Sequence, residues 1–205
     1  MKLPLPKIRE LIEAIKALIK GPYTSKFPKE PHVAHRNFRG QPKYNAEKCV
    51  GCLACEMVCP VGAIAHRDDI VQNGMSKRTM IHYTDTCIFC GECEANCIAD
   101  REGIKLSNDW ELSFFDRKQA FETIEKELQL CEVCGGIVAC KDHLKWVSEK
   151  IGELTYSSPT LYLSRLRELG VVDENLVAPF KDCGRSDRVK ILCAQCRRQT
   201  TMTAQ

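Results

Sequence analysis

Cysteine is the residue type whose spacing in this sequence could support chemistry. The 205 residues include 14 cysteines, and eight of these form two runs with the same spacing, C-x2-C-x2-C-x3-C. Such a run can place three thiolates around one iron–sulfur cube from a single short loop, because its backbone N–H groups turn inward toward the sulfides. The two runs therefore predict two [4Fe–4S] clusters. They consist of Cys49, Cys52, Cys55 and Cys59, and of Cys87, Cys90, Cys93 and Cys97.

The fourth cysteine of each run is expected on the following helical turn, pointing away from the first three. In two-cluster ferredoxins this cysteine ligates the other cluster. The predicted ligand sets are therefore crossed: Cys49, Cys52, Cys55 and Cys97 for cluster 1, and Cys87, Cys90, Cys93 and Cys59 for cluster 2. The alternatives are two zinc sites or a set of disulfides, but zinc sites use pairs of C-x-x-C knuckles rather than tandem four-cysteine runs. Pro60 after Cys59 also matches the bacterial ferredoxin pattern, whereas Cys97 has no proline after it.

Two later cysteine pairs, Cys131–Cys134 and Cys193–Cys196, have the spacing of zinc knuckles. Four thiolates from two knuckles make a closed tetrahedral site, so the pairs predict one structural Zn²⁺. A rubredoxin-like iron is the alternative, because tetrahedral sulfur suits both metals. Cys140 and Cys183 could each replace a knuckle cysteine, although we interpret them as buried apolar residues. The five histidines lie in no ligand spacing and are expected at the surface or in hydrogen bonds: His32, His35, His66, His82 and His143.

Composition narrows the class of protein. A net charge of +3 is weak, and Arg197-Arg198 beside the last pair is too little for a nucleic-acid-binding face, so no nucleic-acid partner is expected. The N-terminal segment has no continuous apolar stretch of the kind found in signal peptides, and no apolar run is long enough to span a membrane. We therefore expect a cytoplasmic protein whose cysteines bind metal rather than form disulfides.

The elements that position the cysteines predict an α+β fold in three parts. Residues 1–43 contain an amphipathic helix over 7–20, which Gly21-Pro22 ends, and then an extended arm. Residues 44–112 form a two-cluster ferredoxin-like domain with an internal repeat, and Trp110 to Phe114 alternates like a strand. Residues 113–205 form a mainly helical extension closed by a zinc-ribbon-like site of four cysteines. Its helices are expected from Asp116 through Leu128, near 137–154 and near 159–169.

Several segments together resemble a known family. They are His35 to Gly40, Tyr44-Asn45, the run from Cys49 to Pro60, the run from Cys87 to Cys93, and Trp110 to Leu112. This combination is similar to the iron–sulfur subunit shared by respiratory complex I and membrane-bound group 4 [NiFe] hydrogenases. The late pairs resemble the extension of the formate hydrogenlyase and hydrogenase-4 versions of that subunit.

The resemblance implies a non-catalytic electron-transfer subunit. Such a subunit relays electrons between an upstream iron–sulfur donor subunit and the small subunit of the hydrogenase, whose large subunit holds the nickel–iron site. It implies a peripheral position on the cytoplasmic side of the cytoplasmic membrane, with the N-terminal helix against membrane-arm subunits. We expect no catalytic residue and no small-molecule substrate. The alternatives are a chain I-like subunit of a quinone oxidoreductase, or a free ferredoxin-like carrier.

Overall fold

The computed structural model describes residues 7–21, 24–71, 74–172 and 190–203, so Cys183 lies outside the described residues. By its internal contacts the chain separates into two units, residues 1–36 and residues 37–205. The first unit contains the helix α1, Ile8–Lys20, which begins where the Glu10 carboxylate accepts the Lys7 N–H at 3.0 Å and ends at Gly21. The helix expected over 7–20 is therefore confirmed. Among the described residues, no helix is long and apolar enough to cross a bilayer.

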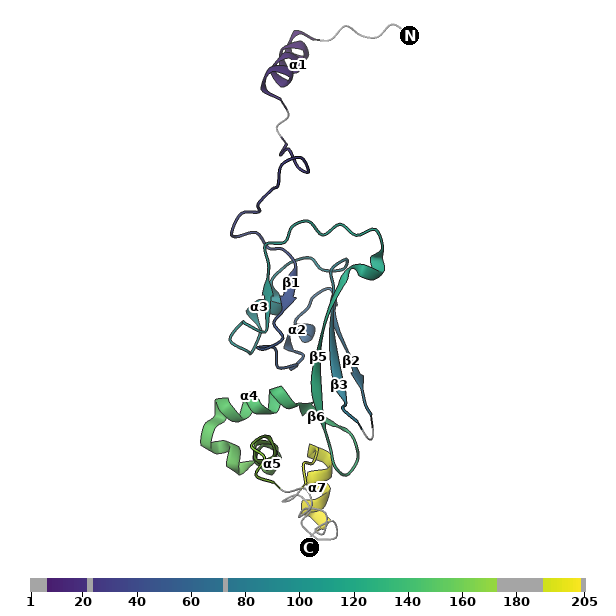
Figure 1. Cartoon of the computed structure of the whole chain (residues 1–205), viewed down its shortest axis with the longest axis vertical. Helices are drawn as coiled ribbons and strands as arrows, with labels where there is room; N and C mark the ends of the chain where they lie inside the picture. The colour runs from purple at the N-terminus through teal and green to yellow at the C-terminus, as the bar shows by residue number, and fades with distance from the viewer. Residues whose placement is uncertain (1–6, 22–23, 72–73, 173–189, 204–205) are drawn as a thin grey trace. The chain divides into compact units, whose positions relative to one another are not determined.

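The second unit is built on two antiparallel sheets. A small sheet pairs β1, Pro42–Tyr44, with β4, Ile104–Leu106. The larger sheet has the strand order β2–β3–β5–β6, formed by Ile64–Asp69, Lys77–Tyr83, Phe121–Leu130 and Ile137–Cys140. Figure 1 shows β5 as the long strand that runs from the cysteine-rich part of this unit to its C-terminal part.

One face of the larger sheet carries most of the buried side chains. In the β3–β5 register Arg78 lies opposite Lys126, and Met80 lies opposite Ile124. All four side chains belong to residues that are at most 9% exposed. Residues directly opposite in an antiparallel pair share a face, so this face combines an apolar centre with a pair of buried cations. We call it the cluster-facing side, because Met80 and Ile124 belong to the same core as Cys55 and Cys93.

Helices cover the far end of β5 and β6. The chain continues from β6 into α4, Lys141–Ile151, then through the 3₁₀ segment η2, Gly152–Ser157, into α5, Pro159–Glu168. The last described helix is α7, Ala194–Thr203. Figure 1 shows α4, α5 and α7 gathered at this end. The helices expected near 137–154 and 159–169 are present, although the first begins at Lys141, after β6.

Two local predictions are wrong. The helix expected from Asp116 through Leu128 is only the 3₁₀ turn η1, Arg117–Gln119, followed by the strand β5. Trp110 to Phe114 forms no strand. Because β5 pairs with β3 along its first seven residues, the larger sheet runs across the division expected between residues 112 and 113. The α+β class is confirmed, and the extension combines two strands with its helices.

Candidate iron–sulfur and metal sites

The first candidate cluster site is a cavity between the two cysteine runs. It is lined by Cys49, Cys52 and Cys55 of the first run together with Cys97 of the second. Tyr44, Met80 and Ile104 complete much of its apolar wall. The four thiols thus gather as crossed ligation requires.

The second candidate site is a similar cavity. Its thiols are those of Cys87, Cys90 and Cys93, joined by Cys59 from the first run. Ile64 and His82, which face each other across β2 and β3, also line it. The two cavities therefore repeat one arrangement with the roles of the runs exchanged. The ligand assignment itself stays a prediction.

The backbone explains how each run bends around its cavity. Gly51 and Leu53 have φ of 68°, and the equivalent residues of the second run, Phe89 and Gly91, have φ of 54° and 86°. Left-handed residues at alternate positions turn successive N–H groups toward one side, as in anion-binding backbone nests. A short helix follows in each run, α2, Ala54–Met57, and α3, Glu92–Ala95. Left-handed conformations are rare for leucine and phenylalanine, which makes this shared geometry a feature of the cysteine loops.

Burial and backbone hydrogen bonds act on these thiols in opposite directions. Burial raises the pKa of Cys55 to about 12 and that of Cys93 to about 11, and neighbouring thiols add to the rise at both. Burial also raises the pKa of Cys49, while the Gly51 N–H and the Lys126 ammonium lower it in part. Metal ligation needs the deprotonated form. Thiols that resist ionisation by themselves would release their protons when a metal binds.

Buried polar atoms provide a test of whether clusters fit these cavities. Within the described part of the chain, the Tyr44 hydroxyl and both His82 ring nitrogens have no hydrogen-bond partner, and His82 is fully buried. Tyr44 lines the first cavity and His82 the second. A buried polar group without a partner is costly, and the sulfur of a bound cluster would be a hydrogen-bond acceptor in each cavity. The residues present therefore fit two iron–sulfur cubes. His82 also corrects the expectation that every histidine lies at the surface or in a hydrogen bond.

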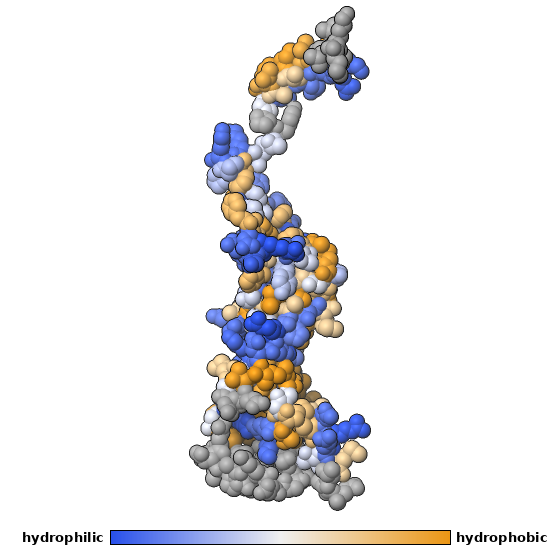
Figure 2. Space-filling view, turned by 90° about the vertical axis from the view of Figure 1, so that its right-hand side faces the viewer, coloured by the Kyte–Doolittle hydropathy of each residue, from blue (hydrophilic) through white to orange (hydrophobic). Residues whose placement is uncertain are grey.

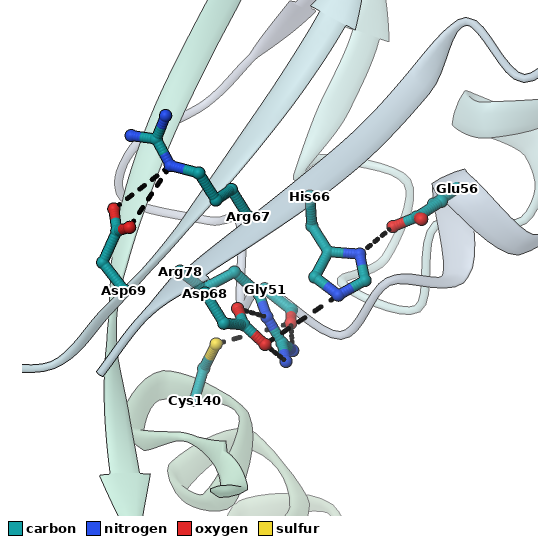
Figure 3. A network of polar contacts seen from close by, with 8 residues as sticks. All are labelled: Gly51, Glu56, His66, Arg67, Asp68, Asp69, Arg78 and Cys140. Atoms are coloured by element: carbon teal, nitrogen blue, oxygen red, sulfur yellow. Dashed lines mark hydrogen bonds and ion pairs between the residues drawn. The ribbon is translucent and has the colours of Figure 1, made fainter.

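A polar network lies behind the loop of the first run (Figure 3). Arg78 donates to the Gly51 carbonyl at 3.1 Å and to the two carboxylate oxygens of Asp68 at 2.7 and 2.8 Å. His66 joins the network through its Nε2, which lies 3.8 Å from Asp68, and its Nδ1 lies 2.6 Å from Glu56. Cys140 is fully buried, and its sulfur lies 3.5 Å from the Gly51 carbonyl. Cys140 therefore packs against the first cysteine loop and away from the late pairs.

The late pairs converge as the sequence predicts. The sulfur atoms of Cys131, Cys134, Cys193 and Cys196 all lie within 4.8 Å of one another, and those of Cys134 and Cys193 are 3.7 Å apart. Four thiolates about 2.3 Å from a central zinc ion would be about 3.8 Å apart. Leu192 is almost fully buried beside the group, and Val138 packs against it. The donor set therefore fits a tetrahedral ion, and sulfur alone suits zinc or iron.

Electrostatics at this group favour a cation. Burial raises the pKa of Cys131. Hydrogen bonds from the backbone N–H groups of Cys134, Cys193 and Val133 outweigh this effect and lower the pKa to about 6. Hydrogen bonding with Cys134, the first of several causes, raises the pKa of Cys196 to about 12. These hydrogen bonds thus favour the thiolate of Cys131 and the protonated thiol of Cys196. A bound metal ion would displace the thiol protons.

Sequence reasoning located the twelve cysteines and missed the side chains behind them. Arg78, Lys126 and His82 lie in strands and carry no motif, so spacing alone could not single them out. On β3 the inward positions are Arg78, Met80 and His82, so only one of the three is apolar and the hydrophobic pattern gives no signal for the other two.

Comparison with known proteins supports the iron–sulfur interpretation. Residues 48–101, which hold all eight cysteines of the two runs, match the model of a family described as a 4Fe-4S dicluster domain. Formate hydrogenlyase subunit 6 of Escherichia coli (strain K12) is 36% identical over 121 residues, which cover 58% of this chain and 64% of that protein. NAD(P)H-quinone oxidoreductase subunit I of Gloeobacter violaceus (strain ATCC 29082 / PCC 7421) is 26% identical over 124 residues, covering 54% and 58%.

These relatives confirm the resemblance inferred from the sequence. The chain spans about three fifths of the length of each. Among solved structures, a chain of the membrane-bound sulfane sulfur reductase, an archaeal respiratory membrane complex, matches with 24% identity and a TM-score of 0.38, covering 58% of this chain and 61% of that one. At that score the structural likeness supports no argument.

Proposed function

We propose that this chain relays electrons through two [4Fe–4S] clusters as a subunit of a larger oxidoreductase complex. The observation that carries the proposal is the pair of cavities, each lined by three cysteines of one run and one of the other. Each cube, when bound, takes up and releases one electron. The chain itself holds the cubes by thiolates, directs backbone N–H groups at the sulfur atoms, and excludes water with the apolar core between the cavities.

We further propose a complex of the formate hydrogenlyase type. In it the chain would pass electrons between a donor iron–sulfur subunit and the small subunit of a membrane-associated [NiFe] hydrogenase. Support comes from the relative named formate hydrogenlyase subunit 6, which is 36% identical to this chain over the matched residues. The second candidate is a chain I-like subunit of a quinone oxidoreductase, which the relatives named subunit I favour. Mass spectrometry of the native assembly would separate the two, because only the first contains a nickel-binding large subunit.

The helix α1 supports assembly into a complex at the membrane surface. All of its apolar side chains are exposed, and Leu18 is 85% exposed. Figure 2 shows them as an orange patch on this helix, with hydrophilic residues beside it. An amphipathic helix of this kind can lie in a membrane interface or dock on a partner subunit. We propose a peripheral position on the cytoplasmic side of the membrane, with α1 against membrane-arm subunits. A free carrier would elute alone in gel filtration.

We propose that the late cysteine group binds one structural zinc ion. It holds together segments more than fifty residues apart in sequence, because Cys134 and Cys193 are 59 positions apart. Metal binding free energy at such a site is folding free energy for the segments it joins. Metal analysis of the purified complex distinguishes zinc from iron.

Iron and sulfide analysis tests the central proposal. Anaerobically purified protein should contain about eight cluster irons and eight acid-labile sulfides per chain, the content of two cubes. Its EPR spectrum after reduction should show two interacting paramagnets. A saturated preparation that holds a single cube would contradict the proposal.

A further inference from the structure

The cluster-facing side of the sheet carries an uneven distribution of charge. Arg78 and Lys126 are directly opposite each other on β3 and β5, and each is only 8% exposed. Like charges directly opposite on neighbouring strands destabilise a sheet, and burial strengthens their repulsion. Each cation has one carboxylate partner, Asp68 for Arg78 and Asp142 for Lys126, and each also donates to a backbone carbonyl.

Both cations contact the loop that forms the first cavity. Arg78 donates to the Gly51 carbonyl at 3.1 Å, and Gly51 lines that cavity. The Lys126 ammonium donates to the Ala46 carbonyl at 2.6 Å, three residues before Cys49. Two carboxylates hold the cations from the side: Asp68 lies opposite Arg78 on β2, and Asp142 lies 2.7 Å from Lys126. The positive ends of both pairs therefore point at the loop.

The second cavity has different neighbours. At the other end of the same sheet face, His82 lies opposite Glu122. Burial lowers the pKa of His82 and so disfavours its cationic form, and Glu122 is a carboxyl group, so neither supplies a cation there. Arg39 does donate to the Cys90 carbonyl at 2.9 Å, but its side chain is exposed to water. Water screens such a charge far more than the interior does.

We propose that Arg78, oriented by Asp68 and reinforced by Lys126, stabilises the reduced form of cluster 1 and selectively raises its reduction potential. Reduction adds one electron, and hence one negative charge, to a cube that four thiolates already surround. A buried cation beside the loop lowers the free energy of that extra charge, and the same cation acts weakly on the more distant cluster 2. The proposal rests on the proposed function, because it requires both cubes to be bound.

The sign of the effect separates electrostatics from loop support. Arg78→Gln removes the cation and leaves Asp68, so the potential of cluster 1 should fall. Asp68→Asn removes the anion and leaves Arg78 on the Gly51 carbonyl, so the potential should rise. If the pair only held the loop in place, both variants would loosen it and shift the potential in the same direction.

The experiment is an EPR-monitored redox titration of the cluster-loaded full chain and its variants. For Arg78→Gln we expect the equilibrium constant for moving an electron from cluster 2 to cluster 1 to fall about tenfold. For a one-electron couple this corresponds to a fall of about 59 mV in the reduction potential of cluster 1 relative to that of cluster 2. For Asp68→Asn we expect it to rise at least about threefold. Arg39→Gln is the matched control, because it removes a similar but exposed contact, and it should change the constant less than about twofold.

Each outcome has a defined meaning. Shifts of opposite sign confined to cluster 1 support the proposal. Shifts of the same sign, equal shifts at both clusters, or no shift with both cubes present overturn it. If Arg78→Gln does not retain its clusters, Lys126→Gln replaces it in the comparison with Asp68→Asn, because Lys126 is the second buried cation that contacts the first cysteine loop. A wild-type chain with fewer than two cubes would contradict the proposed function instead, and iron analysis detects that case separately.

Discussion

Gly51 is the position where a single methyl group should disturb the first cluster site most. Its φ is +68°, and a Cβ placed there would lie 2.6 Å from the Cys140 sulfur and 3.3 Å from the Lys126 Cβ. The left-handed conformation costs about 1–2 kcal/mol for a residue with a side chain. Overpacking against the fully buried Cys140 adds about 1–3 kcal/mol. We expect Gly51→Ala to destabilise the chain by about 2–5 kcal/mol.

Two further variants divide this cost into its parts. Gly62 has a φ of +64° and open space around its Cβ position, so Gly62→Ala carries the backbone cost alone, about 1–2 kcal/mol. Cys140→Ala removes the sulfur that the new methyl group would meet. The double variant Gly51→Ala with Cys140→Ala should therefore recover at least about 1 kcal/mol relative to Gly51→Ala.

Thermal denaturation of the anaerobic, cluster-loaded protein measures these differences through the loss of cluster absorbance. For a chain of this size about 1 kcal/mol corresponds to roughly 2–4 °C in Tm, so Gly51→Ala should lower Tm by about 4–20 °C. The double variant should regain several degrees. If the two substitutions simply add, or if Gly62→Ala is as damaging as Gly51→Ala, the contact between Gly51 and Cys140 does not have the role assigned to it.

Three other predictions follow from the sites and from α1. Cys59→Ala should damage the cluster on Cys87, Cys90 and Cys93, and Cys97→Ala should damage the other. EPR of each variant tests this, and loss of the cluster of its own run would refute crossed ligation. Cys193→Ser should release one zinc per chain and keep about eight cluster irons. It should also make the segment between Cys134 and Cys193 sensitive to limited proteolysis. Equal resistance in variant and wild type would argue against a structural metal. Ile12→Lys should shift the chain from the assembled to the free fraction in gel filtration, while Glu13→Lys, on the polar face of α1, should not; equal behaviour of the two would exclude docking through the apolar face.

Much of the cysteine chemistry could be read from the sequence because it depends on local spacing. Each run folds around its cavity by its own backbone, and the late C-x-x-C pairs each form one short turn. The helix α1 was also predictable, since its apolar residues repeat with helical spacing and Gly21 ends it. None of these features needs information from a distant part of the chain.

The strand β5 could not be recognised for a physical reason that concerns the site. Its inward positions alternate as a strand requires, and Ile124, Lys126 and Leu128 are all buried. A lysine at the middle inward position hides the alternation, so Phe121, Ile124 and Leu128 resemble a helical stripe instead. Arg78 likewise places a charge at a buried, inward position of β3. Charges that face the first cysteine loop thus break the hydrophobic pattern on which strand prediction depends.

The same strand connects the two kinds of metal site and limits how strongly they can affect each other. Lys126 contacts the first cysteine loop. Cys131 directly follows the last residue of β5 and lies five residues after Lys126, which is about 16 Å along a strand. β3 pairs with β5 only as far as Glu127, so the late cysteine group lies beyond the part of β5 that pairs with β3. Loss of the metal should therefore loosen β6 and α7 first. Because β6 ends at Cys140, against Gly51, any effect that travels further should reach cluster 1 before cluster 2.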